Sequence, residues 1–479
     1  MAFLPIALIV AALCLFKLRP VPSYLITLAV TASLALACYG MAPREVLTAS
    51  LEGAVAAIWP ICILMYAALF LFSLTLGLEE KELVKKVFTR PGEEGASVLL
   101  IALALGSVLE GLVGFGVSLM IPITLMAASG LDRAGSARAG LVAISTPTNF
   151  GSMGITMTVL SGATGFSPEV LSSAIVRYSF PITFLLPYLV LSSYRGTLRL
   201  KGKELKLAFL SGLLYSSCYT AAGILLGPAA PALTAGLALT LMLASGREGT
   251  GLSLSAFKPL LPVLTAFLFL LLPSLIRPLG SFLSRFTLSF TIYSGPEPGL
   301  VSIPLLNTPG ILLLIGTLTG ALILHKPVSG ALKGTFAAHK VTLSVVVLIL
   351  MVSRLMGYSG MTEELSGTLV ALSGRFYPFF SPVTGMLGAF LTGTSTSSCI
   401  LFGPVQVRAA RALGMDALPF SSFNGIGAGV GKIPAPQNLV QAMGASGVKD
   451  TKELSFIYPV FLLTLAESSL LCFLACQSR

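Results

Sequence analysis

Residues 105–116 read LGSVLEGLVGFG, and residues 387–398, which lie 282 positions later, read LGAFLTGTSTSS. Both strings lie inside long apolar stretches, 96–130 and 383–413, and both place glycines where a helix would otherwise continue. The same offset superposes Pro122 on Pro404 and GATG (162–165) on GASG (444–447). Agreement in the middle and at both ends predicts an internal repeat. The alternative is that two glycine-rich apolar segments resemble one another by composition alone.

The composition of the chain excludes an ordinary soluble domain. Apolar residues make up 55% of the 479 residues and charged residues 10%, against roughly 45–50% and about 25% in soluble domains. A water-facing surface cannot be built from these residues, so the bilayer is the expected solvent. Since a crossing needs about 20 apolar residues, the predicted fold class is an all-α polytopic membrane protein with about 11–13 transmembrane helices and two re-entrant hairpins.

Lysine and arginine mark the predicted cytoplasmic side. The net charge of +11 is spread over short connections between apolar runs, and the richest are 78–95, 194–206 and 325–340. The positive-inside rule assigns all three to the cytoplasm, so the charge requires no nucleic-acid partner. Three apolar stretches separate the first two connections, and three simple crossings would put them on opposite sides. The stretch 96–130 is therefore predicted to enter and leave by the cytoplasmic face, and both termini are expected to be extracytoplasmic.

The predicted organisation is one membrane transport domain that contains two related halves. Its parts are the whole domain 1–479, a first repeat core 51–193 with the re-entrant hairpin 96–130, connecting spans 194–338, and a second repeat core 339–479 with the re-entrant hairpin 383–413. An odd number of spans between the hairpins would invert the second copy, so its hairpin should open to the outside. Inverted repeats with broken helices at the midplane are typical of secondary transporters.

Four segments demand non-helical backbone inside apolar stretches. They are the hairpin tips at 110–116 and 392–398, and later breaks at 145–154 (STPTNFGSMG) and 424–438 (NGIGAGVGKIPAPQN). Such backbone is tolerated at membrane depth only where it is buried in protein or lines a watery cavity. Half-helix N-termini present unpaired N–H groups and partial positive charge, which predicts an anion site. The alternative is that the hydroxyl side chains only cap the broken helix ends.

The predicted substrate-binding residues combine flexible backbone with hydroxyl and amide groups, which supply hydrogen-bond donors and acceptors. They are Gly111, Gly114, Phe115, Gly116, Thr148, Asn149, Gly393, Thr394, Ser395, Thr396, Ser397, Ser398, Asn424, Lys432 and Gln437. His325 and His339 lack metal-ligand spacing, so neither a metal site nor a cofactor is predicted.

Two charged side chains lie inside these broken segments. Glu110 is at the tip of the first hairpin, where burial disfavours the ionised form, so it is the candidate for carrying a coupled proton. The alternative is that Glu110 caps the returning half-helix. Lys432 is the only basic residue of the second later break, and a charge there costs roughly 2.5–3.5 kcal/mol on insertion scales. Its predicted partner is an anion, either the substrate or Glu110, and the alternative is snorkelling to the interface.

Four motifs in this chain resemble those of the L-lactate permease family, which includes lactate and glycolate carriers. They are LEGLVGFG (109–116), TPTNFGSMGI (146–155), FLTGTSTSSCILFG (390–403) and GVGKIPAPQNLV (429–440). The resemblance implies secondary uptake of small 2-hydroxymonocarboxylates with protons, through a fold like that of the ion-transporter superfamily. Family members usually carry Asp at Ser395, Asn at Cys399 and an Ala-Pro pair at Val117 and Ser118, so the coupling ion and the substrate are open to change here.

The sequence therefore predicts a secondary active transporter of the plasma membrane and not an enzyme. It would move a small monocarboxylate such as L-lactate or glycolate by alternating access, with a small organic anion, protons or another cation, and membrane lipid as partners. A homodimer is expected by analogy with the wider superfamily. The alternatives are a carrier for a different small organic anion with other ion coupling, a channel, and an intramembrane enzyme, which the lack of a nucleophile with a histidine partner disfavours.

Overall fold

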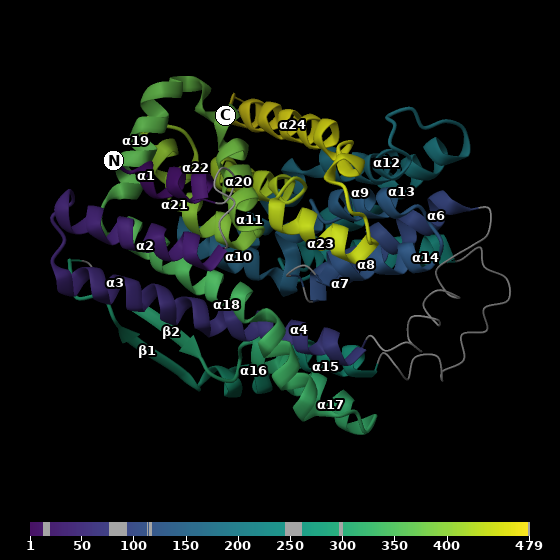
Figure 1. Ribbon diagram of the computed structural model, residues 1–479, viewed down its shortest axis with the longest axis horizontal. Helices are drawn as coiled ribbons and strands as arrows, with labels where there is room; N and C mark the ends of the chain where they lie inside the picture. The colour runs from purple at the N-terminus through teal and green to yellow at the C-terminus, as the bar shows by residue number, and fades with distance from the viewer. Residues whose placement is uncertain are drawn as a thin grey trace. The chain divides into compact units, whose positions relative to one another are not determined.

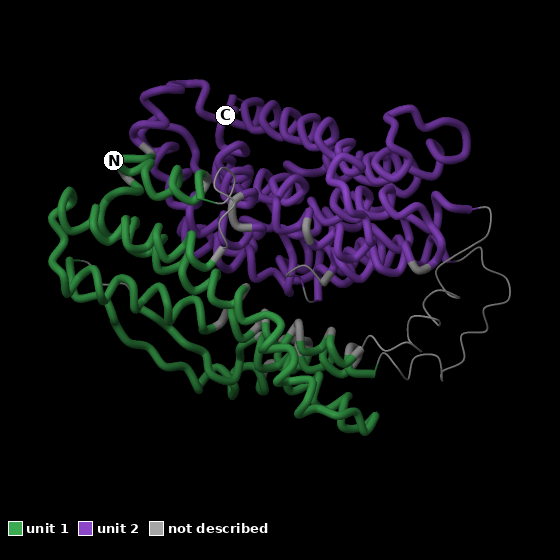
Figure 2. Tube along the Cα trace, viewed as in Figure 1, with its two compact units in different colours: residues 1–80, 252–365 green, residues 81–251, 366–479 purple. Residues whose placement is uncertain are grey.

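The protein divides into two compact units. The structure, a computed structural model, describes residues 1–12, 20–75, 93–112, 114, 117–244, 261–296 and 300–477. Figure 2 colours unit 1, residues 1–80 and 252–365, and unit 2, residues 81–251 and 366–479. The predicted first repeat core, 51–193, is thus divided, because its first helices pack in unit 1 against helices from the middle of the chain.

Unit 1 consists of helices and one two-stranded antiparallel sheet (Figure 1). Its elements are α1 (Leu4–Val10), α2 (Pro20–Ala37), α3 (Pro43–Ala56), η2 (Ala57–Cys62), α4 (Ile63–Thr75), α15 (Leu261–Leu275), α16 (Arg277–Ser284), β1 (Thr287–Thr291), β2 (Leu300–Pro304), α17 (Pro309–Ile323) and α18 (Val328–Tyr358). The sheet pairs Thr287 with Pro304 and Thr291 with Leu300. The all-α expectation missed this hairpin, although in β1 (TLSFT) Thr and Ser alternate with Leu and Phe, a pattern that suits a strand.

Every regular element in the described residues of unit 2 is a helix. Its elements are α6 (Glu94–Val98), η3 (Leu99–Leu105), α7 (Gly106–Leu112), α8 (Val117–Ala128), α9 (Arg133–Ala143), η4 (Pro147–Phe150), α10 (Gly151–Thr164), α11 (Pro168–Tyr178), α12 (Phe180–Arg195), α13 (Lys203–Leu225), α14 (Pro231–Ala244), η6 (Gly374–Phe376), α20 (Tyr377–Thr392), α21 (Ser395–Leu413), α22 (Ala417–Gly431), α23 (Pro436–Ser446), η7 (Thr451–Leu454) and α24 (Ile457–Gln477). Helix α19 (Met361–Ser373) begins in unit 1 and ends in unit 2.

Kinks and breaks interrupt many of the apolar stretches. In the described part of the chain, three helices are long and apolar enough to cross a membrane, namely Glu94–Leu112, Lys203–Leu225 and Thr451–Gln477, and two bent pairs raise the number to at most five. One bent pair is α11 with α12, at 59°. Two further apolar stretches, 51–75 and 137–160, are also divided, the first by extended backbone at Trp59 and the second by η4.

Glycines let α22 approach its neighbours closely on two sides. A Cβ on Gly427 would overlap the carbonyl of Pro382 in α20, and one on Gly431 would overlap that of Met386. On another side of α22, Gly429 lies against the carbonyl of Ser145. The break predicted at 424–438 is confined to 432–435, because α22 runs unbroken to Gly431. The glycine run instead serves close helix packing.

This packing predicts that Gly427→Ala destabilises the protein whereas Gly444→Ala does not. Overpacking a tight contact costs about 1–3 kcal/mol, and a Cβ on Gly444, in α23, would have no atom within 4 Å. Thermal unfolding of the purified variants in lipid nanodiscs measures the difference. Equal melting temperatures would contradict the role assigned to Gly427.

Candidate functional site

The first predicted hairpin is two helices that pack antiparallel around Gly114. Gly106 in α7 lies against the backbone of Ser118 and the ring of Pro122 in α8, and Ser118 Oγ donates a hydrogen bond to Glu110 Oε2. These pairs are symmetric about residue 114, where φ is +64°, a value that favours glycine. The chain therefore turns back at this position. Phe115 and Gly116 lie outside the described residues.

The second predicted hairpin has the same form. Helix α20 ends at Gly393, where φ is +71°, and α21 begins two residues later. Ser398 Oγ in α21 donates to the Gly385 carbonyl at 2.6 Å, and Gln406 Nε2 lies 3.4 Å from the Ser381 carbonyl. These contacts pair positions on either side of Gly393, so α20 and α21 also pack antiparallel. The interruption is shorter than predicted, because Ser395 to Ser398 already form the first turn of α21.

The first later break contains strained backbone. Ser152 and Met153 adopt φ of +49° and +56° between the short helix η4 and the regular part of α10. Such conformations cost of order 1–3 kcal/mol for residues other than glycine and cluster at functional sites. A Cβ on Gly114 would clash with the Ser152 hydroxyl. The break predicted at 145–154 is thus confirmed, and Ser152 lies against the tip of the first hairpin.

A buried ion pair joins the first hairpin to the end of α22. Lys432 Nζ lies 3.4 Å from Glu110 Oε1, and the two side chains are 5% and 2% exposed. Lys432 Nζ also donates to Thr148 Oγ1 at 2.7 Å. Of the two partners predicted for Lys432, the structure places Glu110 beside it. Burial of the Lys432 ammonium excludes snorkelling to the interface. The described hydrogen-bond partners of Glu110 are side chains, so Glu110 does not cap a helix end through these bonds.

The predicted hydroxyl cluster at the start of α21 separates into different roles. Thr394 Oγ1 accepts a hydrogen bond from Ser397 N at 3.2 Å. Thr394 therefore caps the helix end, as the alternative for these hydroxyl side chains expects. Thr396 Oγ1 lies 3.2 Å from Thr156 Oγ1 in α10 and links the two halves of unit 2. Ser395 Oγ is buried and has no hydrogen-bond partner among the described residues. Ser395 therefore offers a hydroxyl at a helix N-terminus.

The predicted amide residues also leave buried polar atoms unpaired. Within the part of the chain that the structure describes, Asn149 Oδ1 and Asn424 Nδ2 have no partner. Asn424 Oδ1 accepts from Gln406 Nε2 at 3.2 Å. Gln437 lies beside Gly393, where a Cβ would be 2.6 Å from its Oε1. Gly111 faces the backbone of α14 at Leu233, which makes it a packing position.

Sequence reasoning missed two buried polar residues that hold this region together. Gln406 bridges Thr384, Asn424 and Ser381 from α21, and Tyr219 Oη donates to the Thr146 carbonyl at 2.9 Å. A glutamine between valines in an apolar stretch was the available signal for Gln406. The tyrosine carried none, because tyrosine is common in such helices.

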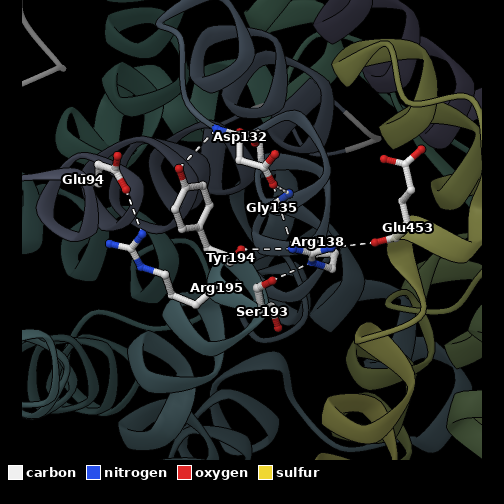
Figure 3. A network of polar contacts seen from close by, with 9 residues as sticks. Glu94, Asp132, Gly135, Arg138, Ser193, Tyr194, Arg195 and Glu453 are labelled. Carbon is white, nitrogen blue, oxygen red and sulfur yellow. Dashed lines mark hydrogen bonds and ion pairs between the residues drawn. The ribbon is translucent and has the colours of Figure 1, made fainter. Parts of the chain in front are cut away.

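A second polar network lies at the end of α12, near a predicted cytoplasmic connection (Figure 3). Arg138 donates to the carbonyls of Ser193 at 2.7 Å, Tyr194 at 3.1 Å and Glu453 at 2.6 Å. Arg195 pairs with Glu204 at 2.6 Å, and that hydrogen bond raises the pKa of the Arg195 guanidinium. This network caps the C-terminal end of α12 and does not touch the buried ion pair.

Helices interrupted inside apolar stretches, with a buried charge pair at the interruption, define a polytopic membrane transport protein. A family model of L-lactate permeases matches residues 1–246 and 262–473, so this chain belongs to the L-lactate permease family. Its members are permeases, which makes the chain a multi-pass membrane protein and a transporter.

Relatives agree with this assignment, and a solved structure has a similar fold. The chain is 30% identical over 435 residues to the L-lactate permease of Streptococcus iniae, covering 87% of this chain and 91% of that protein. It is 25% identical over 517 residues to the glycolate permease GlcA of Escherichia coli, covering 96% and 92%. Its fold is similar to the crystal structure of the Alcanivorax borkumensis YdaH transporter, with a TM-score of 0.52 at 13% identity over 95% of this chain and 98% of that one.

The ion pair makes a prediction for stability. Lys432→Met leaves a carboxylate buried without its counter-charge, which costs about 3–5 kcal/mol, whereas replacing both members of a buried pair is close to neutral. The double variant Lys432→Met/Glu110→Gln should therefore recover most of the melting temperature that Lys432→Met loses. Additive losses in thermal unfolding would show that the two side chains do not interact.

Proposed function

We propose that this protein is a secondary active transporter that moves a small monocarboxylate such as L-lactate or glycolate together with protons by alternating access. The observation that carries the proposal is the buried pair of Lys432 and Glu110 beside the broken backbone of unit 2. The relatives named L-lactate permease and glycolate permease support the substrate class.

Charge balance supports coupling to a proton. Lys432 donates a short hydrogen bond to Thr148, while its contact with Glu110 is longer, at 3.4 Å. A substrate carboxylate can replace Glu110 beside the ammonium if Glu110 takes up a proton at the same time. Lys432 is then paired before and after loading, and no buried charge is left alone. Movement of the neutral combination avoids carrying a net charge through the protein.

The remaining predicted residues would complete the site around this exchange. The N-terminus of α21 and the unpaired Ser395 hydroxyl offer donors to a carboxylate. Asn149 Oδ1 and Asn424 Nδ2 are an acceptor and a donor without partners among the described residues, and a substrate hydroxyl both donates and accepts. Leaving buried polar atoms unpaired costs about 1–3 kcal/mol each, which binding would regain.

Matching features of the two halves support an inverted repeat with re-entrant hairpins. Each half of unit 2 contains an antiparallel helix pair that turns at a left-handed glycine, Gly114 or Gly393. Asp132 and Asp416 then cap the next helix of each half. Helices α10 and α23 end at Gly165 and Gly447, which are 282 residues apart. The repeat, the orientation of the hairpins and the number of crossings, about 11–13, are part of this proposal.

Counterflow tests the proposal. Proteoliposomes that contain the full chain and unlabelled L-lactate should accumulate labelled L-lactate, and an imposed inward proton gradient should raise the initial rate. Glycolate should compete. Lys432→Ala and Glu110→Gln should each reduce exchange by at least about tenfold, the effect of losing about 1.4 kcal/mol in the transport step.

Matched controls are Lys452→Ala and Glu169→Gln, because both side chains are exposed on unit 2. These variants should exchange lactate like the unchanged protein. Uptake that does not saturate would indicate a channel. If lactate exchanges but the Lys432 and Glu110 variants behave as their controls do, the site proposed here is wrong; if another organic anion exchanges in place of lactate, the substrate is wrong.

A further inference from the structure

Ser118 is a buried residue in direct contact with the ion pair. It is 1% exposed on α8 and its hydroxyl donates to Glu110 Oε2. The other carboxylate oxygen, Oε1, faces Lys432. The Glu110 carboxylate is therefore held between a hydroxyl from α8 and the ammonium at the end of α22.

The surroundings of Glu110 leave its carboxylate little freedom to turn. A Cβ on Gly151 would be 2.8 Å from Oε1, so α10 closes that side of the carboxylate. A serine hydroxyl has one hydrogen to donate, and this one is donated to Glu110. A hydrogen bond given to the ionised carboxylate favours the ionised form over the protonated form. The Ser118 hydroxyl thus contributes to the orientation of the Glu110 carboxylate.

We propose that Ser118 is a positioning residue that keeps Glu110 ionised and paired with Lys432, and so sets the proton concentration at which the carrier loads its proton. This inference rests on the proposed function in assigning the coupled proton to Glu110.

Two other titratable groups face Glu110 within the described residues. Lys432 approaches from the end of α22, and Tyr215 lies on α13, where its hydroxyl is 2.8 Å from Ser107 Oγ, one turn before Glu110. Both are unchanged in variants of Ser118. A change in titration on removing the Ser118 hydroxyl therefore reports on Glu110 itself.

Infrared spectroscopy of the full chain in lipid measures this protonation without any substrate. The carbonyl band of the protonated Glu110 carboxyl is identified by its loss in Glu110→Gln, and its intensity is followed against pH. Ser118→Ala and Ser118→Cys, a near-isosteric variant, should shift the midpoint about one pH unit or more to higher pH, as expected for losing a hydrogen bond to a charged group. Ser118→Thr keeps the hydroxyl, so its midpoint should equal that of the unchanged protein.

Ser107→Ala is the matched control, because it removes a hydroxyl from α7 that bonds Tyr215 instead. Its midpoint should equal that of the unchanged protein. If the midpoints of Ser118→Ala and Ser118→Cys also equal that of the unchanged protein, the inference is overturned, even if lactate counterflow succeeds. A shifted midpoint in a protein that exchanges no lactate would leave the role of Ser118 standing and reject the proposed substrate.

Discussion

The ion pair of Lys432 and Glu110 lies in the interior of unit 2, where neither side chain reaches water through an exposed surface. A buried charge without a partner is strongly destabilising, so each side chain depends on the other and on the hydroxyls of Thr148 and Ser118. These four residues come from α7, α8, η4 and the end of α22. The pair therefore holds together three segments of unit 2, namely the first hairpin, the break at 145–154 and the end of α22.

Close backbone contacts between helices allow Lys432 and Glu110 to meet. Glycines of α22 let that helix touch α20 on one side and the carbonyl of Ser145 on another, which brings Lys432 to Glu110. The left-handed residues Ser152 and Met153 lie beside the same site and store conformational strain. When a ligand binds at such a site, it can give the unpaired amide atoms the hydrogen-bond partners that they lack, and the backbone strain can be relieved at the same time.

Much of the site followed from local sequence patterns, while its connections did not. Gly114, Gly393 and the break at 145–154 were predictable, because glycine and proline are the residues that most often interrupt a helix in an apolar run. The glycines at 425, 427, 429 and 431 do not interrupt their helix, because glycine also allows close helix packing, and only the neighbouring helix distinguishes the two uses. The contacts of Ser118 and Gln406 depend on which helices meet, and sequence spacing does not contain that information.

A structure determined with bound L-lactate tests the central claim most directly. The account predicts that the lactate carboxylate lies within hydrogen-bond distance of Lys432 Nζ, with Thr148 still bonded to the ammonium and Glu110 displaced from it. Lactate bound elsewhere, with the Lys432–Glu110 contact unchanged, would contradict the account.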